Sequence, residues 1–375
     1  MKFSVIEVHN HQTKKLFIHL PWRIYPPQAD HYWVPPIISE EWKLLDPATN
    51  PFYQHADVSL FLALDEKRQP VGRIAAIVNH QHLKFHQEKI GFFGFFESIN
   101  SPEAAQLLLD TARHYLQSKG MTAMRGPMNF SINDTCGLLI EGFDSPPTFL
   151  MTYNPSYYPE LFEKCGLAKL KDLYAYYMNP DTVNLPQKIN RITERIQSRN
   201  EITVRHPDMK NLDREVKIIQ EIYNRAWEDN WGALPMTDAE IQFMLKGLKP
   251  LLVPEFLLIA EVGGQPTGFS LTLPDYNQAI KKMNGRLWPF GFFRFLLEKR
   301  KIKKLRMITM GVVKEFRKRG IDVIFYLESI KQAQRLGYRE AELSWVLEDN
   351  DLMNRTIQSL GARIYKKYRI YQKVI

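Results

Sequence analysis

Short apolar runs alternate with polar stretches along the chain, and their lengths and bounding residues predict a regular order of strands and helices. In the first half, apolar runs between turn residues predict strands over 57–64, 71–79, 89–99, 123–130 and 170–178. Helices are predicted at 103–118, just after Pro102, and at 157–164, before Gly166. Residues 1–50 are rich in proline and aromatic side chains and are predicted as one strand followed by irregular, well-anchored chain.

The second half repeats this order after a stretch at 181–200 that is predicted to be a linker. Helices are expected at 212–227, 238–246, 321–336 and 352–360. Strands are expected at 256–262, 267–273, 305–313, 340–347 and 365–374. A chain of 375 residues is long enough for two domains of ordinary size. We therefore expect one domain over 1–180 and a second over 201–375.

Two ungapped alignments indicate that the halves are copies of one pattern. Gly94–Gly120 matches Gly311–Gly337 as strand, turn, helix and closing glycine. Leu161–Met178 matches Thr356–Lys373, and Gly166 then aligns with Gly361. The same order of elements surrounds both matches, which makes chance similarity a poor explanation.

The turn before the helix differs between the copies in a way that bears on chemistry. The second copy has Arg317, Lys318, Arg319, Gly320 and Ile321 there, whereas the first has an acidic residue, Glu103, in place of the glycine. A glycine and basic side chains at a helix start form an anion site, because free backbone N–H groups and the helix dipole face the ligand. A helix start with a solvated basic face is the competing interpretation.

This turn resembles the acyl-CoA loop of the GNAT acyltransferase superfamily, Gln/Arg-x-x-Gly-x-Gly/Ala. Arg317 and Gly320 match that pattern, and Asp322 replaces its last small residue. The later family pattern Asn-x-x-Ala-x-x-x-Tyr-x-x-x-Gly is matched at Asn350 and the final glycine, with Ile357 in place of the tyrosine. The whole chain resembles tandem GNAT proteins of bacteria, on segments such as GFFGFFE, YNPSYY and NWGALP.

The resemblance implies an α/β (α+β) fold of two GNAT-like domains, each a mixed, mostly antiparallel sheet flanked by helices, with a degenerate first copy. It implies acyl-CoA or acetyl-CoA as the donor, and Asp322, which would repel a pyrophosphate, leaves an acyl carrier protein as an alternative. By resemblance, Asn350 would bind the pantetheine arm, and Tyr365 or Tyr368 would replace the missing tyrosine as general acid. The backbone of the preceding strand would also bind pantetheine, through Met310, Gly311, Val312 and Val313.

The acceptor amine has two candidate regions. In the superfamily the loop between the first two helices lines the acceptor pocket, which here implies Asn230 and Trp231. Glu228 and Glu348 are candidate bases for deprotonating an amine, with Asp229 and Asp349 beside them, and a solvated turn is the competing interpretation for each. In the first half, polar groups that could face a ligand, or satisfy one another within a structural loop, are Asn129, Ser131, Asn133, Asp134 and Tyr153.

Composition restricts the remaining possibilities. Two cysteines and an early polar N-terminus lead us to expect a cytoplasmic protein without a disulfide framework. His80, His82 and His86 are expected to be surface histidines, and no metal is expected. The net charge of +9 favours an anionic partner. Binding to nucleic acid would rest on that charge alone, because no helix-turn-helix pattern is present.

Residues 288–304 join a bulky apolar block, WPFGFFRFLL, to a run of basic residues. This composition has three interpretations: peripheral contact with a membrane, the lining of an acyl channel, or an extra helix packed on the core. The sequence as a whole predicts an N-acyltransferase that acts on an amine, with a tilt toward a lipid-like substrate. A GNAT-fold protein that has lost catalysis and only binds ligands or partners is the alternative, and a DNA-binding regulator ranks third.

Overall fold

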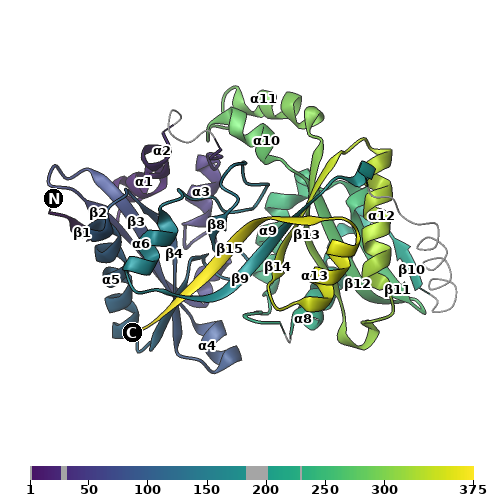
Figure 1. Ribbon diagram of the computed structural model, residues 1–375, viewed down its shortest axis with the longest axis horizontal. Helices are drawn as coiled ribbons and strands as arrows, with labels where there is room; N and C mark the ends of the chain where they lie inside the picture. The colour runs from purple at the N-terminus through teal and green to yellow at the C-terminus, as the bar shows by residue number, and fades with distance from the viewer. Residues whose placement is uncertain (1, 27–31, 183–201, 229) are drawn as a thin grey trace. The chain divides into compact units, whose positions relative to one another are not determined.

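A computed structural model describes residues 2–26, 32–182, 202–228 and 230–375 (Figure 1). They form two compact units. Unit 1 consists of Met1–Leu173, Asn277–Lys299 and Lys366–Ile375, and unit 2 of Tyr174–Tyr276 and Arg300–Tyr365. Two segments of the expected second domain, 277–299 and 366–375, thus pack with the N-terminal unit. The expected linker at 181–200 lies almost entirely outside the described residues.

Unit 1 is built on a sheet whose strand order is β1-β2-β3-β4-β5-β15-β9. Neighbouring strands from β1 to β15 pair antiparallel, except that β4 and β5 are parallel. The strands of unit 1 are β1 Ser4–Glu7, β2 Ala56–Leu64, β3 Pro70–Asn79, β4 Ile90–Ser98, β5 Ala123–Gly126, β6 Met128–Asn129, β7 Thr135–Cys136, β8 Leu138–Glu141 and parts of β9 Ala168–Met178 and β15 Arg363–Val374. Of these, β6 and β7 form a separate two-stranded sheet, and β8 pairs with β15. Its helices are α1 His11–His19, α2 Pro21–Ile24, α3 Ile38–Leu44, α4 His80–His86, α5 Pro102–Ser118, α6 Tyr158–Lys164, α10 Asn277–Ile280 and α11 Gly291–Glu298.

Three predictions for unit 1 were wrong. Residues 1–50 contain three short helices instead of irregular chain, and the first begins with a capping box in which Asn10 and Thr13 satisfy each other's backbone N–H groups. The strand predicted at 123–130 stops at Gly126, where Pro127 cannot donate a ladder hydrogen bond. The histidines at 80–86 lie on helix α4, and His82 is buried rather than exposed.

Unit 2 has the same kind of sheet, in the order β9-β14-β13-β12-β11-β10. Strands β10 to β13 pair antiparallel, whereas β13 and β14 are parallel. The strands that belong wholly to this unit are β10 Ile202–Arg205, β11 Leu257–Val262, β12 Gln265–Pro274, β13 Lys304–Val312 and β14 Glu340–Leu347. The α-helices are α8 Leu212–Trp227, α9 Asp238–Leu248, α12 Ile321–Arg335 and α13 Asp351–Ser359.

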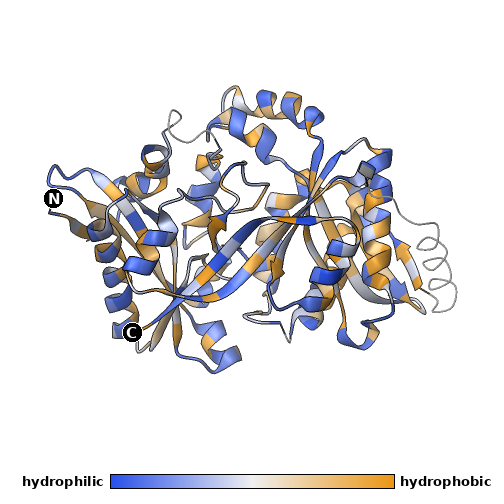
Figure 2. Ribbon diagram, viewed as in Figure 1, coloured by the Kyte–Doolittle hydropathy of each residue, from blue (hydrophilic) through white to orange (hydrophobic). Residues whose placement is uncertain are grey.

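Helices α8 and α12 cover opposite faces of this sheet. Phe269 on β12 packs against Ile222 and Ala226 of α8. The next residue back, Gly268, faces the ring of Phe325 on α12. Successive strand residues point to opposite faces, so the two helices sandwich β12 and β13. Six of the eight buried positions of α12 are apolar, and Figure 2 shows apolar colouring along this helix.

The duplicated strands are exchanged between the units. In unit 1, β5 pairs with β15, whose residues come from the end of the chain. In unit 2, β14 has β9 as its neighbour, which follows the helix of the first copy. These are the segments whose sequences align as copies, so each unit uses the last strand of the other half. The closing glycines of both copies, Gly120 and Gly337, have positive φ of 79° and 74°, which explains why both copies have glycine there.

Candidate functional site

The parallel strands β13 and β14 of unit 2 separate after a short paired stretch. Their register runs from Lys304↔Glu340 to Met307↔Leu343, yet β13 continues to Val312 and β14 to Leu347. The other edge of β13 stays paired with β12 up to Val312. Within the described part of the chain, the edge of β13 that faces β14 therefore has backbone N–H and C=O groups without strand partners over 308–312, and the Val312 carbonyl accepts from Arg317. An unpaired edge of this kind is suited to an extended ligand that contains amides.

The connection from β13 to α12 is longer than its counterpart in unit 1. Eight residues, 313–320, separate β13 from α12, whereas three, 99–101, separate β4 from α5. The ungapped alignment of the two copies hides this difference, because β13 ends earlier than β4 relative to the helix. The additional residues form the basic loop that the sequence singled out.

This loop turns its backbone toward the start of α12. Lys318 and Gly320 both have positive φ, 63° and 82°, while the helix begins at Ile321. When neighbouring residues alternate between left-handed and right-handed backbone conformations, their N–H groups point toward one place, as in anion-binding nests. Among the described residues, no acceptor is recorded for the N–H groups of 318–323. Together with the positive end of the α12 dipole, these groups could receive a phosphate.

Two of the three consecutive basic side chains at 317–319 already have structural contacts. The Arg317 guanidinium donates to the carbonyl oxygens of Ala226 (2.6 Å) and Val312 (3.2 Å), and thus ties the last turn of α8 to the end of β13. The Arg319 guanidinium lies 4.9 Å from the ring centroid of Phe316. Lys318, between these two arginines, is exposed. A cation next to carbonyls at a helix C-terminus is favourable, so Arg317 stabilises the loop as well as adding charge.

The side chains of the predicted pantetheine strand point into the core. Met310 and Val312 pack against Ile321 and Phe325 of α12. Gly311 lies on the opposite face, where a Cβ would approach the Trp227 ring to 2.2 Å. Val313 is fully buried against α8. This segment can offer a ligand only backbone groups, which is what the resemblance implied.

Asn350 caps helix α13. Its side-chain oxygen accepts from the backbone N–H of Met353 at 3.2 Å. The neighbouring Asn354, which the sequence analysis missed, is more deeply committed: it accepts from the Tyr176 hydroxyl (2.7 Å) and donates to the carbonyl of Leu347 (3.0 Å). Ile357, in place of the family's tyrosine, is a buried core residue. The cap uses one lone pair of the oxygen, so the NH₂ group and the second lone pair could contact a ligand.

A buried polar network lies where β13 and β14 are still paired. Arg306 and Glu342 face each other across the two strands and are 2% and 0% exposed. The Ser344 hydroxyl donates to Glu342 (2.6 Å) and accepts from Arg306 Nε (3.0 Å). The Tyr365 hydroxyl donates to the other oxygen of Glu342, and the Lys304 ammonium lies 5.2 Å from the Tyr365 ring centroid. The candidate acid Tyr365 is therefore coupled to a buried carboxylate.

The sequence analysis missed Arg306, Glu342 and Ser344. The available signal was the presence of charged residues inside the runs KLRMITM and EAELSWVL, which are otherwise typical of buried strands. A charge in such a run is costly unless it is paired. A charged residue within each strand of a predicted parallel pair is the pattern that marks Arg306 and Glu342.

The remaining predicted residues of unit 2 lie at its loops. Glu228 follows the last residue of α8 and is exposed, and Asp229 lies outside the described residues. Asn230 turns the chain, donating its N–H to the Trp227 carbonyl at 2.8 Å, and Trp231 follows it. Glu348 comes directly after β14 and is partly buried.

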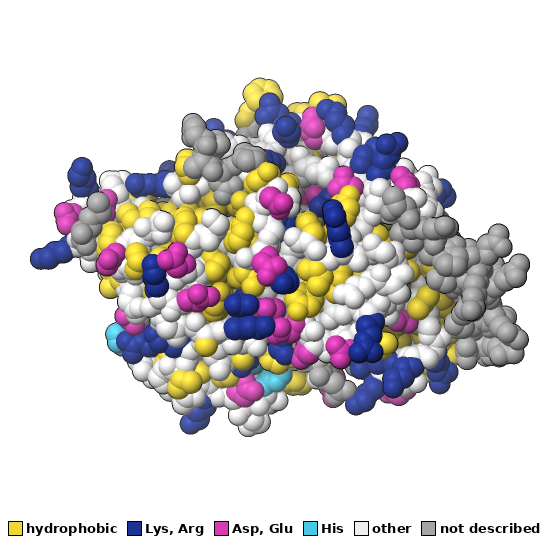
Figure 3. All heavy atoms as spheres, viewed as in Figure 1, with side chains coloured by type: hydrophobic (Ala, Val, Ile, Leu, Met, Phe, Trp, Pro, Cys, Tyr) yellow, Lys and Arg dark blue, Asp and Glu magenta, His cyan; other side chains and the backbone are white. Residues whose placement is uncertain are grey.

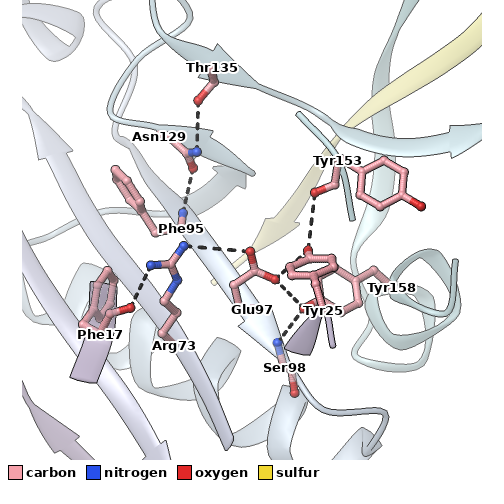
Figure 4. A network of polar contacts seen from close by, with 10 residues as sticks. All are labelled: Phe17, Tyr25, Arg73, Phe95, Glu97, Ser98, Asn129, Thr135, Tyr153 and Tyr158. Atoms are coloured by element: carbon pink, nitrogen blue, oxygen red, sulfur yellow. Dashed lines mark hydrogen bonds and ion pairs between the residues drawn. The ribbon is translucent and has the colours of Figure 1, made fainter. Parts of the chain in front are cut away.

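Unit 1 fills its corresponding gap with its own chain. The parallel pair β4–β5 ends at Phe92↔Arg125. Beyond it, the carbonyl of Met128 would lie 1.9 Å from a Cβ on Gly94, so β4 and the following segment are in direct contact. The Asn129 side chain accepts from the Phe95 N–H (2.7 Å) and donates to Thr135 (3.0 Å) (Figure 4). Asn129, a predicted ligand-binding residue, thus pairs with the strand edge that is left open in unit 2.

The neighbouring loop satisfies its own polar groups. Asp134 accepts hydrogen bonds from the hydroxyl (2.8 Å) and the N–H (3.1 Å) of Ser131, and the Ser131 hydroxyl accepts from the N–H of Asn133 (3.1 Å). The carbonyl of Tyr153 accepts from the Tyr25 hydroxyl at 3.4 Å. These contacts are the ones expected if the polar groups satisfy one another within a structural loop.

The same region holds a buried carboxylate, Glu97, shown in Figure 4. It accepts from the hydroxyls of Tyr25 (2.8 Å) and Tyr158 (2.7 Å) and lies 3.8 Å from Arg73. Burial raises the pKa of Glu97, and the opposing Arg73 charge only partly offsets this effect. Arg73 in turn donates to the carbonyl of Phe17 (2.8 Å). The network joins the N-terminal helices to β3 and β4.

No group of histidine, cysteine or acidic side chains within the described ranges is arranged to hold a metal ion. His82 is 3% exposed, and burial, with the nearby His86 and Arg125 charges, lowers its pKa to about 3. Its ring packs edge-on against Phe92 at 4.8 Å. His82 is therefore a neutral core residue.

Comparison with known proteins gives a consistent picture. No protein-family model matches the chain. It is 37% identical over 379 residues to the bacterial ceramide synthase of Caulobacter vibrioides, covering 99% of this chain and 97% of that protein. It is 32% identical to Protein YghO of Escherichia coli, covering 98% and 94%. A tandem GNAT protein from the clavulanic acid biosynthesis pathway superposes with a TM-score of 0.60 over 100% of this chain and 98% of that one, at 9% identity.

Proposed function

The chain belongs to the family of the bacterial ceramide synthase and Protein YghO, within the GNAT superfamily, and on that premise we propose that it is an N-acyltransferase for a long-chain amine. The tandem GNAT architecture is confirmed. The observation that carries the proposal is 37% identity along almost the whole length of a ceramide synthase. A ceramide is an amide of a fatty acid with a sphingoid base, so the proposed acceptor is a sphingoid-like amine and the proposed donor a long-chain acyl thioester.

The geometry of unit 2 supports the donor half of this proposal. The unpaired edge at 308–312 is suited to the amides of a pantetheine arm. The free N–H groups at 318–323 and the exposed Lys318 are suited to its phosphates. Asp322 in the first turn of α12 opposes the phosphate charge, and a carrier protein remains the alternative source of the thioester. Unit 1, whose gap is filled by Asn129, would contribute no second donor site.

The reaction needs little from the protein beyond positioning and proton transfer. The amine nitrogen attacks the thioester carbonyl, the carbon–sulfur bond breaks, and the thiolate takes a proton. Glu228 or Glu348 would accept the proton that the ammonium loses, and Tyr365 would protonate the thiolate. The hydrogen bond from Tyr365 to Glu342 provides this tyrosine with a fixed orientation. The acceptor residues proposed in unit 2 are Asn230 and Trp231.

The decisive experiment combines turnover with a matched pair of glycine variants. Purified protein is incubated with palmitoyl-CoA or acetyl-CoA and with either sphinganine or the polar amine spermidine, and the amide product is measured by mass spectrometry. Gly320→Glu copies the residue of the first copy at the anion loop. Gly264→Glu is the control, because Gly264 also has positive φ (80°) but faces open space in the β11–β12 turn.

We expect sphinganine to be acylated from palmitoyl-CoA, and Gly320→Glu to abolish both turnover and the thermal shift caused by palmitoyl-CoA. Gly264→Glu should retain both. Acylation of spermidine alone, from acetyl-CoA, would contradict the lipid assignment. Absence of turnover and of any shift with either thioester would favour the GNAT-fold binding protein without catalysis.

A further inference from the structure

A cluster of exposed apolar side chains surrounds helix α11 in unit 1. Five large ones occur within ten residues, and their exposed fractions range from 41% to 79%. They are Trp288, Phe290, Phe292, Phe293 and Leu297. No residue of α11 itself is buried. Helix α11 thus lies on unit 1 without burying any of its own residues fully.

The most exposed residues of this cluster share one side of the helix. Phe290, Phe293 and Leu297 are spaced three and four residues apart, which places them on one helical face. They are 79%, 60% and 64% exposed. Apolar side chains also project at the top of Figure 3, above the basic ones. Aromatic residues at such exposures usually contact something other than water.

Basic residues border this face. Residues 277–299 contain five lysines and arginines and one acid, Glu298, for a net charge of +4. Four of the five basic residues are exposed, and they precede, interrupt and follow the aromatic residues: Lys282, Arg286, Arg294 and Lys299. The whole chain carries +9. The cluster therefore complements a surface that is both apolar and anionic.

Specific contacts hold the segment on unit 1. Asn277 donates to the carbonyls of Pro147 and Thr148, both at 2.9 Å. The Trp22 indole donates to Asn284 (3.1 Å), and the carbonyl of Gly285 accepts from the Ile38 N–H (3.0 Å). The segment is thus anchored by its first half, which leaves the aromatic face of α11 exposed.

We propose that α11 and the residues before it, 288–299, form a docking surface for an anionic lipid bilayer. The aromatic face enters the boundary between headgroups and acyl chains, and the basic residues contact anionic headgroups. Among the described residues, no helix is long and apolar enough to cross a bilayer. The proposed contact is interfacial. Given the proposed function, docking would bring the protein to the membrane in which a long-chain amine resides.

Binding is tested without any acyl donor or amine. The full chain is sedimented with vesicles of phosphatidylcholine and phosphatidylglycerol in a 7:3 ratio, and with vesicles of phosphatidylcholine alone. We expect binding to the anionic vesicles that weakens with salt. The double variant Phe290→Ser, Phe293→Ser should reduce this binding by roughly tenfold or more, because it removes two apolar rings that would be buried in the bilayer. The control is Phe85→Ser, an aromatic residue 41% exposed on α4.

A charge series separates the basic component. Lys282→Gln, Arg286→Gln and Lys299→Gln together should weaken binding to anionic vesicles by about fivefold per charge removed. Three exposed lysines elsewhere, changed in the same way, serve as the control: Lys67, Lys84 and Lys246. We expect the control set to bind nearly as the unchanged protein does. Equal weakening by both sets would indicate attraction by net charge alone and would overturn the assigned surface.

Two further outcomes would overturn the proposal. One is the absence of binding to anionic vesicles at low salt. The other is concentration-dependent self-association that Phe290→Ser with Phe293→Ser abolishes, since the surface would then be covered by a second copy. Failure of the acylation experiment leaves vesicle binding unaffected. Conversely, lost vesicle binding with full turnover of detergent-dispersed substrate would remove only the docking function, so the two proposals can fail separately.

Discussion

The side-chain oxygen of Asn129 accepts a hydrogen bond from the backbone N–H of Phe95 at 2.7 Å. This contact closes, in unit 1, the strand edge that unit 2 leaves open between β13 and β14. The two halves thus share a fold and differ in what occupies the gap between their parallel strands. A side chain of the same molecule is always present at this edge, so a ligand would have to displace it.

Asn129→Ala is expected to destabilise the protein without creating a second donor site. The Phe95 N–H would lose its partner, at a cost of about 1–3 kcal/mol in free energy of unfolding. Met128 would still contact Gly94, so the gap would stay filled. Urea unfolding measures the loss of stability. Calorimetry measures how many palmitoyl-CoA molecules bind, and so tests for a second donor site. A rise from one to two bound thioesters would contradict this account.

Gly311→Ala should displace the indole of Trp227. The new methyl would lie 2.2 Å from Trp227 Cζ3, and overpacking of this kind typically costs about 1–3 kcal/mol. Gly247→Ala on helix α9 is the control, because a Cβ there meets nothing within 4 Å. It should raise the free energy of unfolding by roughly 0.5–1 kcal/mol. Combining Gly311→Ala with Trp227→Leu should recover part of the loss. If the two substitutions change the free energy of unfolding additively, the new methyl group does not act through the Trp227 ring.

Tyr365→Phe tests the proposed acid against a purely structural role. We expect kcat to fall while KM for palmitoyl-CoA stays nearly constant, because the hydroxyl acts on the leaving thiolate. Glu342→Gln keeps an oxygen acceptor for the hydroxyl, so it should lower kcat less than Tyr365→Phe does. An unchanged kcat in Tyr365→Phe would leave the hydroxyl with its hydrogen bond to Glu342 as its only role.

His82 should make the protein sensitive to acid. Its pKa is lowered to about 3 in the folded chain, against 6.5 for a free histidine, so the unfolded chain binds the extra proton first as pH falls. Stability should decline between pH 6.5 and 3 by at most about 1.4 kcal/mol per pH unit. Glu88, 3.9 Å from Nε2, is partly exposed and also faces Arg125, which limits its opposing effect.

The measurement is urea unfolding at pH 7, 5.5 and 4. His82→Leu removes the titrating ring and should flatten the decline, whereas His80→Gln, at an exposed position of the same helix, should not. Parallel curves for the unchanged protein and His82→Leu would place the acid sensitivity in other groups.

The sequence determined the elements and the duplication, because both depend on local patterns. Periodicity gave α8 over 212–227 as observed, and it gave β14 over 340–347. The glycines at 120 and 337 marked helix ends through a local requirement for positive φ. The basic loop at 317–320 and the resemblance to GNAT enzymes were visible for the same reason: neighbouring residues form them.

Only the tertiary structure decided which groups are free to act. It committed the Arg317 guanidinium to the carbonyls of Ala226 and Val312 and placed Asn129 against β4. It also assembled Arg306, Glu342 and Tyr365, which are distant in sequence. It exchanged the last strands between the units and left the aromatic face of α11 in solvent. Pairing and burial depend on long-range packing free energy, which no local pattern of residues encodes.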